Sequence, residues 1–362
     1  MTTAIQASPR VTAGVTRVRT QLANEHTPLI HNCWYVAGCA SEFNRTLKER
    51  TLLGKSVVFY RRENGQPVAL QNRCPHRSFP LSNGVLEGDT VRCGYHGMAF
   101  NAAGECVDIP SQNVVSANAC IRHYPVVERG PFVWIWTGAQ EEADENLIPD
   151  TRWLSSPDWA YAQAYVELKA NYVGLHENLL DLTHFTYLHP TTLGTPEFAG
   201  SPFEVEVSER QVRITRYVEE CDVPPMYVKT GIPGKMSRHT ISDFLTPALH
   251  HASAVLRNRS ETVGRDAFTV YISHFLTPET QNTTHYWFTF ARDFALDDAE
   301  VTQYMEKSAL HAFHEDVFAL EQIRRMHAIE PDAGEAEINL KSDQAGVAAR
   351  RVLKQLADRE VA

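Results

Sequence analysis

The chain has 362 residues, of which 43% are hydrophobic and 22% charged, a balance that is typical of a globular protein and excludes a disordered or collagen-like chain. Its 34 Lys and Arg residues against 44 Asp and Glu residues give a net charge of −10, which argues against a general nucleic-acid-binding protein. No run of about 18 apolar residues occurs, so the sequence predicts neither a transmembrane helix nor a membrane partner.

The first 30 residues show no pattern of a folded element. They lack the apolar core of a signal peptide, so we expect residues 1–30 to form a flexible tail. Seven cysteines are scattered along the chain, an odd and low number that does not fit a disulfide scaffold. It favours a reducing compartment, where clustered Cys and His more often bind metal, and we therefore expect a cytoplasmic protein.

The next region is predicted to be rich in β-structure and to form a domain over residues 31–147. Short β-branched or aromatic runs, bounded by turn residues, predict strands at 56–61, 67–72, 90–93 and 132–138. An acidic stretch at 139–152 marks the boundary to a second domain, residues 148–362.

Two loops of the first domain each carry one cysteine and one histidine. Cys74 and His76 lie in the first loop, and Cys93 and His96 lie in the second. A zinc finger pairs Cys with Cys and His with His, so zinc is disfavoured. In a Rieske [2Fe-2S] cluster one iron takes both thiolates and the other takes both imidazoles, which matches one Cys and one His from each loop.

The second domain is predicted to mix helices and strands. Residues 171–186, 297–328 and 343–358 have helical patterns, and residues 203–221 and 240–292 alternate as strands do. No GxGxxG or phosphate-binding loop occurs, so the usual motifs for a nucleotide or flavin are absent from the sequence.

A second group of candidate ligands lies around the first of these helices. Asp181 and His184 are three residues apart and would share a helix face, and His189 follows where the helix must end. Non-haem Fe(II) that activates O₂ typically takes two His and one carboxylate on one face. The carboxylate would come from Asp316 on the long C-terminal helix, although spacing alone does not separate it from Glu315.

With both motifs, the chain resembles the Rieske non-haem iron oxygenases, and most closely their vanillate O-demethylase and dicamba monooxygenase group. The segments that carry the resemblance include WYVAG (34–38), CPHRSFPLSNG (74–84), CGYHGMAFNAAGECVDIPSQ (93–112), ENLLDLTHFTYLH (177–189) and KSDQAGVAARRVL (341–353). The resemblance implies an α+β protein, in which an all-β Rieske [2Fe-2S] domain precedes a helix-grip (START-like) catalytic domain that holds mononuclear iron.

The resemblance also implies the site residues. Those that match the family's motifs are Cys74, His76, Cys93 and His96 for the cluster, and His184, His189 and Asp316 for mononuclear Fe(II). Asn178 matches a residue near the iron, and Asp181 matches an acid that bridges subunits. In a head-to-tail homotrimer, Asp181 would link His96 of a neighbour to His184 of its own subunit.

The implied activity is that of the terminal oxygenase component of a monooxygenase system in aromatic catabolism. O₂ and NAD(P)H-derived electrons from a ferredoxin and/or flavin reductase would oxidise a small aromatic substrate by O- or N-dealkylation, such as demethylation, or by hydroxylation. An aromatic cis-dihydroxylating dioxygenase stays open as an alternative. So do two proteins of other classes, a Rieske electron carrier and a zinc-stabilised ligand-binding module.

The substrate pocket is expected to be mostly apolar, with few orienting polar groups. His274 and His285 lie on predicted strands, where they could donate hydrogen bonds to a substrate carboxylate. His250 and His251 are similar candidates with weaker support.

Overall fold

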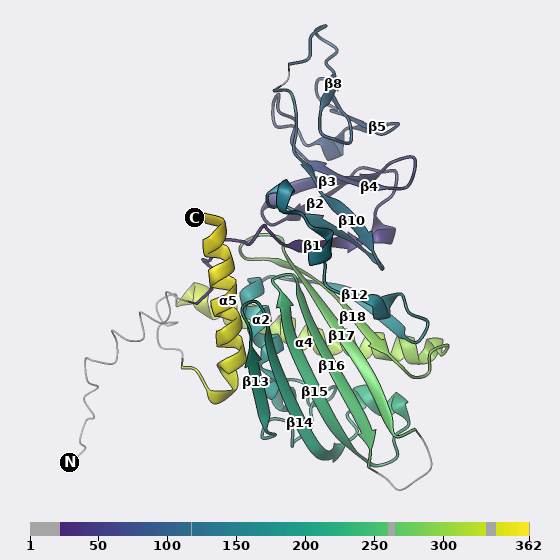
Figure 1. The fold of residues 1–362 in the computed structure, drawn as a ribbon, viewed down its shortest axis with the longest axis vertical. Coiled ribbons are helices and arrows are strands. Elements are labelled where there is room, and N and C mark those ends of the chain that lie inside the picture. The colour runs from purple at the N-terminus through teal and green to yellow at the C-terminus, as the bar shows by residue number, and fades with distance from the viewer. Residues whose placement is uncertain (1–21, 117, 260–264, 331–337, 362) are drawn as a thin grey trace, which may run out of the picture.

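The computed structural model describes residues 22–116, 118–259, 265–330 and 338–361. These residues form a β-rich part with small sheets, which stands on a larger part built from one long sheet and its helices (Figure 1). The predicted order, an all-β part followed by an α+β part, is confirmed. Among the described helices, none combines the length and the apolar run that crossing a bilayer requires.

Residues 34–136 supply the strands of the β-rich part. Their bounds are β1 Trp34–Cys39, β2 Lys48–Leu52, β3 Lys55–Arg61, β4 Pro67–Gln71, β5 Val85–Glu87, β6 Thr90–Arg92, β7 Ala99–Phe100, β8 Cys106–Asp108, β9 His123–Tyr124, β10 Val126–Arg129 and β11 Phe132–Trp136. They pair in the orders β1–β11–β10, β2–β3–β4–β9 and β5–β6–β7–β8. The predicted strands correspond to β3, β4, β6 and β11.

A long antiparallel sheet forms the centre of the larger part. Its strands are β12 Ala160–Leu168, β13 Phe203–Val207, β14 Val212–Asp222, β15 Lys235–Thr246, β16 Leu249–Asn258, β17 Ala267–Pro278 and β18 Thr284–Arg292. They lie in the order β12–β18–β17–β16–β15–β14–β13. Because side chains alternate between faces, the register puts Arg238, Thr240 and Ser242 of β15 on the same face as His274 of β17.

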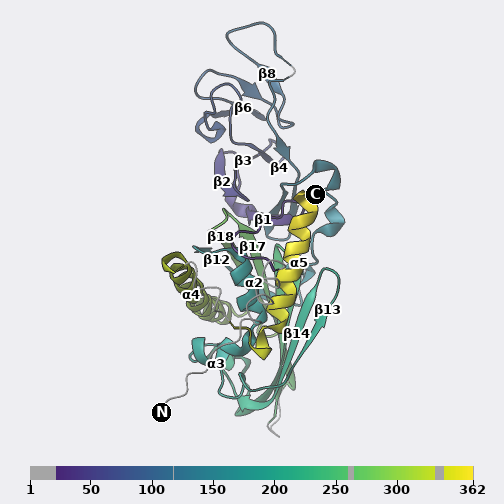
Figure 2. The same cartoon turned by 90° about the vertical axis from the view of Figure 1, so that its left-hand side faces the viewer.

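Two helices cover that face of the sheet. They are α2, Tyr172–Leu180, and α4, Ala299–Ile329, and both lie on one side of the strands in Figure 2. Leu179 of α2 and Phe313 of α4 share a buried apolar cluster with Phe288 of β18. The cluster consists of leucine, phenylalanine and other apolar side chains, so its burial stabilises the packing of both helices on the sheet.

The β-rich part rests on one end of this sheet. Trp134 of β11 packs edge-on against Phe275 of β17, with ring centroids 5.7 Å apart, and Trp287 joins the same buried cluster. The Thr277 hydroxyl donates to the backbone oxygen of Val36 at 2.8 Å. These contacts join the two parts through apolar packing with a buried hydrogen bond at its edge.

The helix predicted at 171–186 is interrupted in the structure. α2 ends at Leu180, where Asp181 takes an extended conformation, and a 3-10 turn and α3, Phe185–Leu188, follow. The Asp181 carboxylate accepts a hydrogen bond from the Thr183 backbone N–H at 3.0 Å and so caps the new turn. Aspartate commonly competes with helical hydrogen bonding in this way, which explains why the single predicted helix is wrong.

The last helix, α5 Gln344–Val361, packs against α2 and holds the start of the described chain. Residues 1–21 of the predicted tail lie outside the described residues, but Leu22 and Ala23 are buried. The Ala23 N–H donates to the Arg350 backbone oxygen at 3.0 Å, and the Asn32 N–H donates to Glu360 at 2.6 Å. A tail that extends to residue 30 is therefore wrong, because these residues find apolar and polar partners on α5.

Candidate active site

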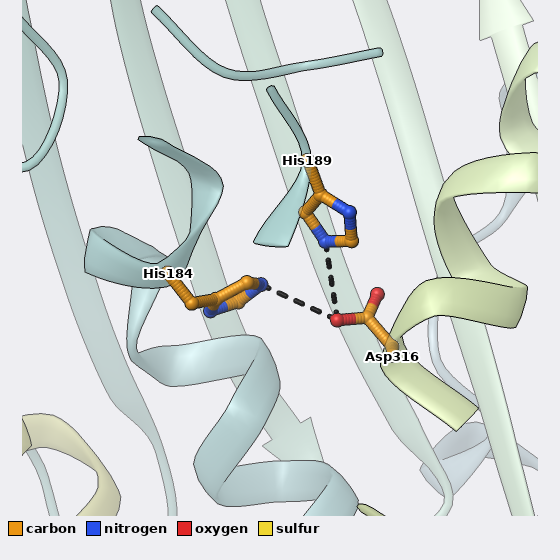
Figure 3. Close-up of side chains that lie close together, drawn as sticks. All are labelled: His184, His189 and Asp316. Atoms are coloured by element: carbon orange, nitrogen blue, oxygen red, sulfur yellow. Dashed lines mark hydrogen bonds and ion pairs between the residues drawn. The ribbon is translucent and has the colours of Figure 1, made fainter. Parts of the chain in front are cut away.

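Three side chains converge where α3 ends beside α4 (Figure 3). Nε2 of His184 lies 3.4 Å from Oδ1 of Asp316, and Nε2 of His189 lies 3.1 Å from the same oxygen. The potential ligand atoms of the three residues all lie within 4.8 Å of one another. The structure thus brings together the three residues that the sequence predicts as ligands of mononuclear iron.

Each of these side chains is positioned by its own element. His184 ends the 3-10 turn that Asp181 caps, and its Nδ1 contacts the Asp181 backbone oxygen, which leaves Nε2 facing Asp316. His189 terminates α3 and is fully buried. Asp316 lies in the middle of α4, where its carboxylate accepts a hydrogen bond from Nδ2 of Asn178 at 2.9 Å. The interruption of the predicted helix is therefore what aims the first histidine.

The structure distinguishes the two neighbouring acids of α4. Consecutive residues of a helix point about 100° apart, so only one of them can face the inner nitrogen of His189. Asp316 does so, whereas Oε2 of Glu315 lies 2.7 Å from Nδ1 on the other side of the ring. Thr192 donates to the same Glu315 oxygen at 3.4 Å. Glu315 thus orients the His189 ring from outside the group of ligand atoms.

The electrostatics of the group are those of a cation site. Burial acts to raise the pKa of Asp316, but the contacts and charges of His184 and His189 outweigh it and hold that pKa well below its usual range. Nε2 of His184 is buried and makes no hydrogen bond to the described residues. A buried carboxylate, with two nitrogens aimed at one point beside it, fits a divalent iron ion.

The predicted cluster ligands lie on two loops of the β-rich part. Cys74 follows β4 and Cys93 follows β6, and both thiols are buried, with burial raising the pKa of Cys74. His76 and His96 are exposed, and their ring centroids are 4.5 Å apart. Two sulfurs inside and two imidazoles at the tip suit a two-iron cluster whose outer iron takes nitrogen ligands.

The two candidate metal centres are far apart in one chain. Figures 1 and 2 place the β5–β8 sheet, whose strands flank the cysteine and histidine loops, at one end of the molecule. α3, which ends directly before His189, lies toward the opposite end of the larger part (Figure 2).

A pocket opens beside the mononuclear group and spans about 560 Å³, including the part that is open to solvent. Asn178, His184 and Asp316 belong to its wall. Most of the other lining is apolar, and it includes Leu179, Leu182, Phe185, Met226, Ile272 and Phe313. A mostly apolar pocket is thus present, as expected, and a metal ion held by His184 and Asp316 would lie at its wall.

The two histidines predicted to bind substrate differ in position. His274 lines the pocket, with its Nδ1 2.6 Å from the Tyr286 hydroxyl, and burial lowers its pKa to about 3, so its imidazole is neutral. His285 lies on the other face of the sheet, where it contacts the Tyr165 hydroxyl at 2.8 Å and the Thr51 backbone oxygen at 2.9 Å. The assignment of His285 to the pocket is therefore wrong. His285 pairs with Thr277, which is three residues from His274 on β17, and residues an odd number apart on one strand point to opposite faces.

His250 and His251, the two weaker candidates for substrate binding, also lie in different places. His250 is buried behind the pocket wall, with Nε2 2.6 Å from the Ser242 hydroxyl. His251 points to the opposite face of the sheet, where its ring packs on Trp153 with centroids 4.5 Å apart. Neither residue lines the pocket.

The one arginine among the described residues that line the pocket was not predicted from the sequence. Arg238 is 98% buried and lines the pocket from β15. The strand pattern contains a signal for it, because Met236, Arg238 and Phe244 lie on one face and the first and last are core residues. A cation in register with core positions is unusual enough to mark a candidate functional residue.

Two known domain families match the chain. The Rieske [2Fe-2S] domain matches residues 33–125, and the vanillate O-demethylase oxygenase C-terminal domain matches residues 168–359. The iron-sulfur subunit of a toluene-4-sulfonate monooxygenase system from Comamonas testosteroni is 40% identical, over 84% of this chain and 90% of its own length. The vanillate O-demethylase oxygenase subunit of Pseudomonas sp. (strain HR199 / DSM 7063) is 31% identical, over 91% and 96%.

Solved structures agree with these similarities. Dicamba monooxygenase bound to dicamba superposes with a TM-score of 0.85 at 29% identity, covering 92% of this chain and 99% of that chain. Dicamba monooxygenase with non-heme iron and dicamba superposes with a TM-score of 0.77 at 27% identity, over the same shares. The similarity therefore extends over both parts of the fold and both candidate metal centres.

Proposed function

The chain belongs to the Rieske non-haem iron oxygenases with a vanillate O-demethylase-type catalytic domain, and from this premise we propose that it oxidises a small aromatic substrate by O- or N-dealkylation or by hydroxylation of an alkyl group. It is the oxygenase component of a monooxygenase system and uses a Rieske [2Fe-2S] cluster and mononuclear iron. The observation that carries the proposal is the apolar pocket whose wall contains His184 and Asp316. A pure electron carrier would not need such a pocket.

We assign the metal ligands as follows. Cys74, His76, Cys93 and His96 would hold the cluster, and His184, His189 and Asp316 would hold the iron. When bound, the iron supplies the position at which O₂ is activated. Asn178 holds the Asp316 carboxylate and Glu315 holds the His189 ring, while the apolar wall keeps water from the reacting carbon. His274, a neutral imidazole, would offer the substrate a hydrogen bond.

We also propose the arrangement in which the enzyme works. Electrons from a ferredoxin and/or flavin reductase would enter the cluster domain, residues 31–147, and reach the catalytic domain, residues 148–362, of a neighbour in a homotrimer. Exposed His96 and Tyr95 at the cluster tip, and half-buried Asp181 beside exposed Tyr187, offer the two surfaces for this contact. The seven cysteines, all among the described residues, form no disulfide, which supports a cytoplasmic location.

A single-turnover reaction tests the activity. Iron-loaded, chemically reduced protein would meet labelled O₂ and a pool of methoxybenzoates, N-methyl aromatics, aryl sulfonates and benzoates, with mass spectrometry of the products. We expect one labelled oxygen per turnover in an organic product. It would lie in the new hydroxyl group where a methyl group is hydroxylated, and in released formaldehyde where a methoxy or N-methyl group loses its CH₂ unit. The matched Asp316→Ala protein should keep the cluster absorption and form no product.

Other results would point elsewhere. Two labelled oxygens on an aromatic ring would replace the monooxygenase by a cis-dihydroxylating dioxygenase. A protein that keeps its cluster but binds no mononuclear iron would be an electron carrier. A colourless protein without acid-labile sulfide would contradict the cluster assignment altogether.

A further inference from the structure

Arg238 is a buried cation that faces the substrate pocket. It belongs to β15, its side chain is almost wholly buried, and it forms part of the pocket wall. Its Nη1 donates to the Leu193 backbone oxygen at 2.8 Å and its Nε donates to the Thr240 hydroxyl at 3.1 Å. Within the described part of the chain, no carboxylate forms an ion pair with it, and Nη2 makes no hydrogen bond.

Another buried arginine on the same face of the sheet is satisfied differently. Arg216 of β14 donates from Nη1 to the backbone oxygens of Phe198, Ala199 and Ser201, and from Nη2 to the Thr183 hydroxyl. Its guanidinium is thus surrounded by oxygen acceptors of the protein itself. Arg238 has one carbonyl and one hydroxyl as acceptors, and it lines the pocket, which Arg216 does not.

Aromatic rings surround the Arg238 guanidinium without neutralising it. Its Cζ lies 5.4 Å from the ring centroid of Phe185, 4.7 Å from that of Phe198 and 5.3 Å from that of Tyr227. Cation–π contacts of this kind stabilise the positive charge but leave it in a medium of low dielectric constant. A buried charge in such a medium is normally paired, so an anion from outside would be bound strongly.

The cation lies within reach of the mononuclear group. The Phe185 ring neighbours both, since its centroid is 5.4 Å from Arg238 Cζ and 5.1 and 5.6 Å from the ring centroids of His184 and His189. One substituted benzene ring lying along Phe185 could therefore place one substituent at the guanidinium and the other at the metal ligands.

We propose that Arg238 binds the anionic group of the substrate, a sulfonate or a carboxylate, and thereby places the far side of the aromatic ring at the mononuclear centre. The inference rests on the proposed function and narrows it to aryl sulfonates and aryl carboxylates. A guanidinium is suited to this task because its donors match two oxygens of one anion at once. The oxidised carbon would lie across the ring from the anionic group.

The other polar groups of the pocket do not supply this charge. Among the described residues that line it, Arg238 is the only arginine or lysine. Burial lowers the pKa of His274 to about 3, so its imidazole offers a hydrogen bond but no positive charge at neutral pH. The thiol of Cys221 is also not a counter-ion for Arg238, because burial raises its pKa.

Binding of matched pairs tests the inference without turnover. The probes are toluene-4-sulfonate with toluene-4-sulfonamide, and 4-methoxybenzoate with 4-methoxybenzamide, each equilibrated with anaerobic holoenzyme at pH 7. We expect wild-type protein to bind at least one anion about tenfold or more tightly than its neutral partner. Arg238→Met should weaken the binding of that anion by about 10- to 100-fold. The affinity for the neutral partner should change by less than about threefold.

Arg216→Met is the matched control, because it also removes a buried guanidinium from the same face but outside the pocket lining. It should destabilise the protein and keep the preference for the anion. Arg238→Lys, which retains a charge without the planar fork, should show an intermediate preference. If Arg238→Met does not fold, the wild-type pairs and Arg238→Lys still decide the question.

The outcomes separate this inference from the proposed function. Equal binding of both members of every pair, or no binding of either anion, would overturn the role of Arg238, even if the enzyme oxygenates a neutral aromatic. Arg238-dependent binding of an anion without any oxygenation would support the anion site while contradicting the oxygenase assignment. A preference for only one of the two anions would identify the sulfonate or the carboxylate as the recognised group.

Discussion

Glu315 and Asp316 are neighbours in the sequence, yet they occupy opposite sides of the same imidazole. Asp316 faces Nε2 of His189, and Glu315 accepts from Nδ1 at 2.7 Å. A carboxylate on the outer nitrogen of a ligating histidine fixes which nitrogen carries the proton and how the ring is turned. Glu315 is therefore a positioning residue, which acts through His189.

Replacement of Glu315 by Gln should weaken the iron site without removing it. We expect iron affinity to fall by about 10- to 100-fold, as measured by iron content after equilibration with chelators of graded strength. The absorption of the cluster should not change, which separates this effect from misfolding. Asp316→Asn should lose far more iron than Glu315→Gln.

Glu306→Gln, on the same helix but outside the group of candidate ligands, is the control and should retain wild-type affinity. Unchanged iron affinity in Glu315→Gln would show that the hydrogen bond to His189 contributes nothing to the metal site.

The sequence motifs could predict the candidate ligands of both metal centres, because their spacing within each loop or turn reflects local geometry. The choice between Asp316 and Glu315 could not be predicted, since the rotation of α4 about its axis is set by packing against the sheet. The prediction that His285 binds substrate is wrong for a related reason. A shift of one residue along a strand changes the face on which a side chain lies, and only the pairing of β17 with β18 fixes that parity.

At the level of elements, the long helices and most strands follow from apolar periodicity. α4 begins at Ala299, with Asp298 accepting from the N–H groups of Glu300 and Val301, as the acidic start of the predicted helix indicates. The break after α2 was not predicted, because the apolar pattern continues through it. One side-chain hydrogen bond of Asp181 interrupts the helix, because it replaces a helical backbone hydrogen bond. The turn that results orients His184.

α5 supports the catalytic domain through α2. Leu353 is fully buried, and Arg350 forms an ion pair with Glu177 of α2 at 3.0 Å. Leu353→Ala should lower the free energy of unfolding by about 2–5 kcal/mol, because it removes a buried side chain and leaves a cavity. Denaturant unfolding of the holoenzyme at constant iron content would measure the change.

Arg351→Ala is the control on the exposed side of the same helix and should change the free energy of unfolding by less than about 0.5 kcal/mol. If the Leu353 variant were as stable as this control, the packing of α5 on the core would contribute little to the fold.

At the level of the whole molecule, the β5–β8 sheet lies at one end and α3 lies toward the opposite end of the larger part, so the two candidate metal centres belong to separate regions of one chain (Figures 1 and 2). If the cluster of each subunit passes electrons to the iron of the next subunit in a trimer, two inactive variants should complement each other. By the proposed assignment, Asp316→Ala would keep the cluster but lose iron, and His76→Ala would lose the cluster but keep iron. Co-expression of both in equal amounts should restore about a quarter of wild-type turnover, because a quarter of neighbouring pairs join a good cluster to a good iron.

Each variant alone, and a mixture of the two separately purified proteins before any exchange of subunits, should be inactive. No recovery in co-expressed, mixed oligomers would contradict transfer between subunits. Asp181→Asn, added to the subunit that keeps its iron, tests the link between the cluster and the iron. Loss of all recovered activity in this variant would support Asp181 as that link.

The contacts between residues 22–30 and α5 also set an order of events during synthesis. Strands β1 to β11 pair among themselves, so the loops that carry Cys74 and Cys93 can take shape while later residues are still being translated. α5 follows every other described element, and both Ala23 and α2 pack on it. The nascent chain can therefore form its cluster-binding loops early, whereas α2, with Asn178 on it, gains its last support only when residue 361 has left the ribosome.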